Sequence, residues 1–128
     1  MKLMKKLYLV LFVLLNFSIC YCQNDTIFVT GDIPILKVKA NEPFVLKFLA
    51  CHDCGYNWSL EKADSSYVKL ISLSSRNTSG RNNIEGGNVY EFWKFTVVSA
   101  GTYVLEFIYK RPWLKEVEKV FNVELHVN

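Results

Sequence analysis

The chain has 128 residues, of which 51% are hydrophobic, 15% aromatic and 21% charged. This length and composition fit one small domain with a single hydrophobic core. The formal net charge of +3 comes from three lysines among residues 1–22, and the rest of the chain carries 12 basic and 12 acidic side chains. Composition and charge therefore give no reason to expect nucleic acid or an anionic membrane as a partner.

Residues 1–22 are predicted to be a secretory signal peptide. Lysines precede the apolar run Leu7–Leu15, and small residues follow it at a plausible cleavage site. The run is shorter than the roughly 20 apolar residues that span a membrane. Lipid anchoring at Cys20 or Cys22 is disfavoured, because Ile19 stands where a lipoprotein signal has a small residue. We therefore expect a secreted or periplasmic protein with no membrane span in its mature part.

Residues 23–128 are predicted to form one domain, and their hydrophobic pattern has a period of two. The final stretch shows it best, with Phe121, Val123 and Leu125 on one face and polar residues on the other. Short strands between glycine-rich turns predict an all-β antiparallel sandwich of about seven strands. The expected strands are Ile35–Val38, Pro43–Leu49, Tyr56–Glu61, Tyr67–Leu73, Asn88–Val98, Thr102–Tyr109 and Val117–Val127.

Three connections of this sandwich have unusual chemistry, and we call them the first, second and third loops. They are Ala50–Gly55, Ser74–Gly87 and Lys110–Glu116. Alternate connections of an antiparallel sandwich emerge at the same end, so these loops are expected to lie together. The second is polar and long, which in a compact domain is typical of a functional or disordered segment. The third presents Arg111-Pro112-Trp113, a combination typical of a binding hot spot, although Trp113 could instead fold back into the core.

Four segments, in chain order, resemble the signatures of the chagasin-like inhibitors of papain-family cysteine peptidases. They are Cys54-Gly55-Tyr56-Asn57-Trp58, Glu85-Gly86-Gly87, Ala100-Gly101-Thr102-Tyr103 and Tyr109-Lys110-Arg111-Pro112-Trp113. The resemblance spans about residues 34–128 and implies an immunoglobulin-like sandwich. It also implies that the three loops occlude the cleft of a papain-family peptidase. The implied peptidase-binding residues are Asp53, Cys54, Gly55, Tyr56, Glu85, Gly86, Gly87, Arg111, Pro112 and Trp113.

The chain departs from the usual family pattern in two of the loops. Cys51-His52-Asp53-Cys54 stands where the family usually has Asn-Pro-Thr-Thr, and Ile84 stands where the second loop usually has its first glycine. In an exported chain two such cysteines usually pair, so a local disulfide between Cys51 and Cys54 is favoured. A thioredoxin-like redox role would require a helix N-terminus, and a zinc site would require two further ligands. We expect no metal and no cofactor.

No enzyme is expected. The neighbouring side chains of His52 and Asp53 rarely point together as a catalytic pair, and no carboxylate pair suggests an acid and a base. A monomer is expected. The alternative function is an extracytoplasmic immunoglobulin-like binding or adhesion module without inhibitory activity. Such a module would use an aromatic strand face, for instance Tyr90 and Phe92, rather than the three loops.

Overall fold

The computed structural model describes residues 26–28, 35–79 and 87–128. These residues form eight strands, joined by turns and loops, and no helix. No helix in these ranges is long and apolar enough to cross a membrane. The strands are β1 (Thr26–Phe28), β2 (Ile35–Val38), β3 (Phe44–Ala50), β4 (Asn57–Lys62), β5 (Val68–Asn77), β6 (Val89–Val97), β7 (Gly101–Lys110) and β8 (Lys119–Val127).

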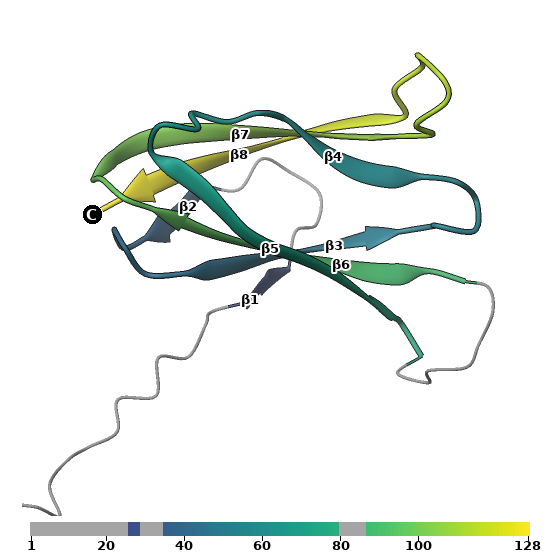
Figure 1. Cartoon of the computed structure of the whole chain (residues 1–128), viewed down its shortest axis with the longest axis horizontal. Helices are drawn as coiled ribbons and strands as arrows, with labels where there is room; N and C mark the ends of the chain where they lie inside the picture. The colour runs from purple at the N-terminus through teal and green to yellow at the C-terminus, as the bar shows by residue number, and fades with distance from the viewer. Residues whose placement is uncertain (1–25, 29–34, 80–86) are drawn as a thin grey trace, which may run out of the picture.

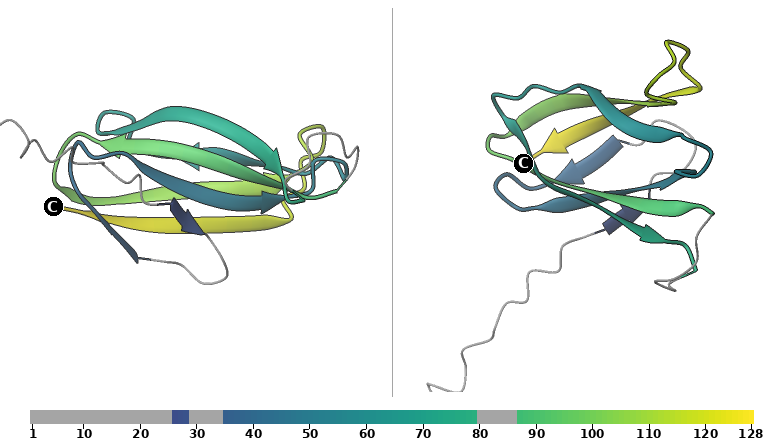
Figure 2. Two further views of the ribbon diagram at one scale, coloured as in Figure 1. Left: turned by 90° about the horizontal axis from the view of Figure 1, so that it is seen from below. Right: turned by 45° about the vertical axis from the view of Figure 1, so that its right-hand side comes forward.

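The strands build two four-stranded sheets that face each other as two layers (Figure 1 and Figure 2). The first sheet has the order β1-β3-β6-β5, and the second has the order β2-β8-β7-β4. All neighbours are antiparallel except β1 with β3 and β2 with β8, which are parallel. The expected immunoglobulin-like β-sandwich is therefore confirmed, with eight strands.

The core lies between the sheets, where the inward positions of the alternating strands meet. In β3 the buried side chains are Phe44, Leu46, Phe48 and Ala50, and the residues between them face outward. The ring of Phe48 packs on that of Phe107 from β7 with centroids 4.6 Å apart. Burying one such side chain contributes about 1.5–3 kcal/mol, so these aromatic contacts tie the two layers together.

The strands differ from the prediction by more than one residue at three places. β1 was not expected; it adds three residues to the edge of the first sheet. β5 continues to Asn77 rather than ending at Leu73, because its backbone ladder with β6 does not depend on apolar side chains. Polar Ser74–Asn77, which we assigned to the second loop, is therefore strand. β8 begins at Lys119 rather than at Val117, whose side chain is exposed.

The first and third loops and the strand ends that flank the second loop lie at one end of the sandwich. In Figure 1 the connections β3–β4 and β7–β8 and the described ends of β5 and β6 lie on the right. The C-terminus and the β4–β5 and β6–β7 turns lie at the opposite end. The predicted arrangement of the loops is thus present for the residues that the structure describes.

Candidate functional site

The first loop is a tight turn closed by backbone hydrogen bonds. Gly55 N donates to His52 O at 2.8 Å, and Tyr56 N donates to Cys51 O at 3.1 Å. Gly55 has a φ of 82°, a left-handed conformation that glycine adopts without steric cost. Cys51 and Cys54 lie at disulfide-bonding distance across this turn, with their Cα atoms 5.2 Å apart. Both the glycine and the cysteine pair restrict the loop to one shape.

The third loop presents Trp113 at the tip of a second tight turn. Leu114 N donates to Arg111 O at 3.0 Å, and Pro112 occupies the turn position at which its fixed φ is favourable. Trp113 is 70% exposed, so it does not fold back into the core. Its ring nevertheless lies against Gly55, because a Cβ built on that glycine would come within 3.0 Å of Trp113 Cζ2 and would overlap Cη2. The exposed indole is therefore supported by the first loop.

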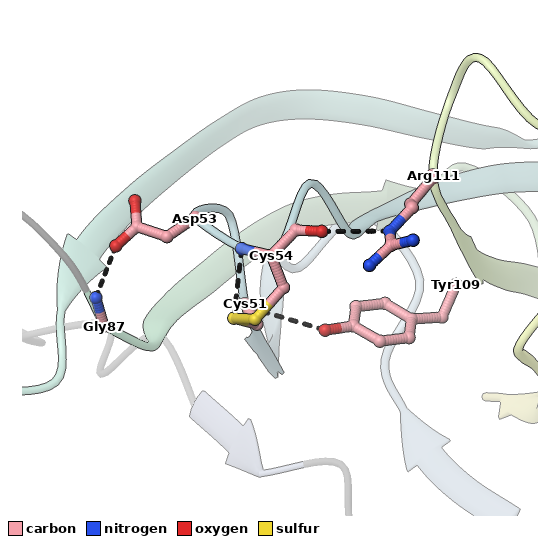
Figure 3. Close-up of a disulfide and its surroundings, with 6 residues drawn as sticks. All are labelled: Cys51, Asp53, Cys54, Gly87, Tyr109 and Arg111. Carbon is pink, nitrogen blue, oxygen red and sulfur yellow. Dashed lines mark hydrogen bonds between the residues drawn. A yellow bond between two sulfur atoms is a disulfide. The ribbon is translucent and has the colours of Figure 1, made fainter.

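One hydrogen bond joins the first loop to the third, and contacts of the adjoining residues Tyr109 and Tyr56 reinforce the junction. Arg111 Nε donates to the Cys54 carbonyl at 3.0 Å, and Cys51 N donates to the Tyr109 hydroxyl at 2.9 Å (Figure 3). The Arg111 guanidinium also lies over the Tyr56 ring, 4.7 Å from its centroid. Arginine suits this position because a planar guanidinium can donate and stack at once.

The second loop is joined to the first at its described C-terminal end. Gly87 N donates to Asp53 Oδ2 at 2.5 Å (Figure 3). Gly87 has a φ of 117°, and among the residues that the structure describes no atom lies within 4 Å of its Cβ position. Glu85 and Gly86, which we also expected to contact a peptidase, lie outside the described residues.

A buried carboxylate anchors the first loop to β6. Glu91 Oε1 lies 2.7 Å from His52 Nε2, and Glu91 Oε2 accepts a hydrogen bond of 3.0 Å from Trp93 Nε1. The Glu91 side chain is only 6% exposed, and a buried carboxylate is tolerated only where donors satisfy its oxygens. This network was not predicted. Its signal in the sequence is a single glutamate within the apolar row Val89, Glu91, Trp93, Phe95 and Val97.

A stack of aromatic rings supports the loops from below. Tyr109 is stacked on Tyr56 at 5.1 Å between centroids and also contacts Trp58 at 4.8 Å. Trp58 Nε1 donates to the Leu49 carbonyl at 2.9 Å, at the end of β3. Sequence analysis did not identify Tyr109 as a site residue. It occupies an inward position at the end of β7, where its hydroxyl reaches the first loop.

The predicted residues that the structure describes are thus brought to one edge. Asp53, Cys54, Gly87, Pro112 and Trp113 are exposed, whereas Gly55, Tyr56 and Arg111 are half-buried and hold the loops together. Within the described ranges no group of three histidine, cysteine or acidic side chains could hold a metal ion. The edge consists of backbone-rich turns around one projecting indole. That shape can fill a groove on another macromolecule.

Comparison with known proteins gives a family match over most of the chain. Residues 37–127 match the family described as chagasin family peptidase inhibitor I42. No curated protein matches the chain by sequence. The crystal structure of the cysteine protease inhibitor EhICP2 from Entamoeba histolytica is similar, with a TM-score of 0.69 and 16% identity over 81% of this chain and 95% of that one.

Two further solved structures have the same fold. Amebosin, solved in solution, gives a TM-score of 0.67 and 14% identity, with 82% of this chain and 98% of that one covered. PbICP-C, solved in complex with falcipain-2, gives a TM-score of 0.53 and 14% identity over 81% and 98% of the two chains. The matched family and EhICP2 are inhibitors rather than enzymes.

Proposed function

Since the chain belongs to the chagasin family of peptidase inhibitors, we propose that it inhibits papain-like cysteine peptidases reversibly and without a covalent bond. In this proposal the three loops enter the active-site cleft and exclude substrate. The observation that carries it is the 70% exposed Trp113, held against Gly55 at the loop end. A large aromatic side chain that is rigid before binding loses little entropy on docking and is typical of a hot spot.

The backbone of the first loop supports the same proposal. A wedge in a peptidase cleft has to resist cleavage, so it must not relax into an extended substrate-like strand. Here Gly55 N and Tyr56 N are engaged within the turn, and the Cys54 carbonyl accepts from Arg111. The segment from Cys51 to Tyr56 is therefore held as a turn rather than as an extended, substrate-like strand.

The cellular setting is part of the proposal. Residues 1–22 act as a signal peptide and are removed, and residues 23–128 are exported as a monomer. Export is consistent with the spacing of Cys51 and Cys54, because disulfides persist in oxidising compartments. The EhICP2 structure, described as that of a cysteine protease inhibitor, supports the class of target.

Titration of papain with purified residues 23–128 tests the proposal. We expect papain activity to fall at micromolar or lower concentrations and to recover on dilution, while trypsin stays fully active. If papain and cathepsin-like enzymes remain active throughout, the inhibitor function is wrong for this chain. The binding or adhesion module would then replace it.

A further inference from the structure

The charges of the sandwich are divided unequally between its two sheets. The strands of the second sheet carry both signs, with Glu61, Glu106 and Glu124 among their lysines. The strands of the first sheet carry three lysines and one arginine but a single acid, Glu91, which is buried and faces the core. A net charge of zero for residues 23–128 therefore conceals one sheet whose described outer face is purely cationic.

Strand register places these cations on the outer face. Lys47 and Lys94 lie on β3 and β6, paired with Phe92 and Val45 respectively, and Arg76 on β5 pairs with Tyr90. The sequence neighbours of Lys47 and Lys94 are buried in the core, so these two lysines point outward. Arg76 lies opposite Tyr90, which precedes the buried Glu91 and therefore belongs to the same outer face. Lys69 lies on the same face at the far end of β5, where its Nζ donates to the Ser65 carbonyl. The other three cations lie across three adjacent strands.

The cations on this face form cation–π contacts with its aromatic rings. The Lys47 ammonium lies 3.9 Å from the centroid of Tyr90, and both Lys47 and Arg76 lie within 6 Å of the Phe92 centroid, at 5.7 and 5.8 Å. Such cation–π contacts are worth about 0.5–1 kcal/mol at exposed sites. The rings are thus occupied by cations, which disfavours stacking with nucleic acid bases.

A shallow hollow lies among these side chains. Its volume is about 330 Å³, and its lining includes Arg76, Lys94, Phe92 and the hydroxyls of Ser72 and Ser74. Within the part of the chain that the structure describes, neither Arg76 nor Lys94 pairs with a carboxylate. Two unpaired cations with hydroxyl donors between them form a site complementary to an anionic group.

We propose that the outer face of the first sheet binds an anionic polysaccharide, with a sulfate or carboxylate group seated between Arg76 and Lys94. An extended polyanion fits better than a small anion because the cations spread over three strands instead of converging on one point. A polysaccharide fits better than a single-stranded nucleic acid because the rings are covered by cations. This surface would act independently of the peptidase-binding loops and would hold the inhibitor on a charged glycan.

The test measures retention of residues 23–128 on immobilised dextran sulfate, polygalacturonate, neutral dextran and an oligo-dT strand. The variant Arg76→Gln with Lys94→Gln removes two cations from the face. The matched control, Lys37→Gln with Lys39→Gln, removes two exposed cations from the opposite sheet and the turn that follows it. Thermal unfolding of each variant checks that the fold is intact. Arg76 is exposed and Lys94 is half-buried on the outer face, and surface substitutions away from the core usually change stability by no more than about 0.5 kcal/mol.

We expect salt-sensitive retention on dextran sulfate or polygalacturonate, whichever supplies the anionic group, and none on neutral dextran. The Arg76/Lys94 variant should reduce the slope of log affinity against log salt by about 2, by analogy with counterion release from other polyanions, and the control should not. Papain inhibition should be equal in all three proteins. Absence of retention on both anionic polymers, or equal retention on oligo-dT, would overturn the proposal. So would an equal loss of retention in the Arg76/Lys94 variant and the control variant, or a loss of papain inhibition in the Arg76/Lys94 variant.

Discussion

The indole of Trp113 and the backbone of Gly55 occupy complementary space at the loop end of the sandwich. No side chain at position 55 could coexist with the ring in its present place, since even a Cβ would overlap Trp113 Cη2. Gly55 and Trp113 lie 58 residues apart in sequence and on different loops. The glycine therefore serves two purposes: it permits the left-handed turn, and it seats the exposed ring.

Gly55→Ala should weaken papain inhibition by at least tenfold, or about 1.4 kcal/mol, because the new methyl displaces Trp113. It should also destabilise the fold by about 1 kcal/mol, because alanine tolerates a φ of 82° poorly. Inhibition constants and urea unfolding measure the two effects. Gly101→Ala is the matched control, since Gly101 also has a positive φ but begins β7, which follows the β6–β7 turn at the other end of the sandwich (Figure 1). Equal inhibition by both variants would show that the seating of Trp113 is irrelevant to binding.

Trp113→Ala should raise the inhibition constant about thirtyfold, equivalent to about 2 kcal/mol, the usual scale of a central aromatic hot spot. Stability should hardly change, because the side chain is 70% exposed. Arg111→Ala should cost less, about 1 kcal/mol, because its half-buried guanidinium orients the first loop through Cys54. Val104→Ala, an exposed apolar truncation on a strand face, is the control. A Trp113 variant that inhibits like the wild type would remove this residue from the interface.

Sequence reasoning predicted the fold and the loop end well for identifiable reasons. The alternation of Phe121, Val123 and Leu125 is set by burial on one face of β8, which a local pattern records directly. A turn at Arg111-Pro112-Trp113 was expected from its residue types, but whether the Trp113 ring is exposed or folds into the core was left open. The contact of Trp113 with Gly55 could not be predicted, because it depends on how two turns from different hairpins approach each other.

The cysteine pair should be oxidised in the exported protein. Thiol counting on non-reduced residues 23–128 should therefore find no reactive thiol, and two reactive thiols would contradict the disulfide. Replacing both Cys51 and Cys54 with serine should cost no more than about 2 kcal/mol of stability, because the closed loop is short. Inhibition should weaken more clearly than stability, since the first loop loses a restraint on its shape.

The pair formed by half-buried His52 and buried Glu91 should contribute to stability. Glu91→Gln replaces one acceptor oxygen with an NH2 group, so one of the two donors, His52 Nε2 or Trp93 Nε1, loses its acceptor. Urea unfolding should therefore show a loss of about 1–3 kcal/mol. Glu106→Gln is the control, because that carboxylate pairs with an exposed lysine and such pairs contribute about 0–1 kcal/mol. If the two variants unfold alike, Glu91 is not an anchor of the first loop.

The Glu91–His52 network and the distribution of charge on the first sheet could not be predicted from the sequence. The sequence shows Glu91 within the apolar row of its strand, but its partner His52 lies 39 residues away on a loop. Likewise, a net charge of zero gave no indication that Arg76 and Lys94 share a face without acids. Both features arise from strand order, since β6 is flanked by β3 and β5, and strand order was not predicted.

The central claim is that the loops enter the active-site cleft. It is tested most directly by comparing the affinity of the protein for papain with an open cleft and for papain with a filled cleft. Calorimetry would compare free papain with papain whose cleft is occupied by a covalent peptidyl inhibitor. If the loops enter the cleft, free papain should bind the protein tightly, and filled papain should bind it at least a hundredfold more weakly, equivalent to about 2.7 kcal/mol. Equal affinity for the two forms would contradict the account, because the protein would then bind papain outside its active site.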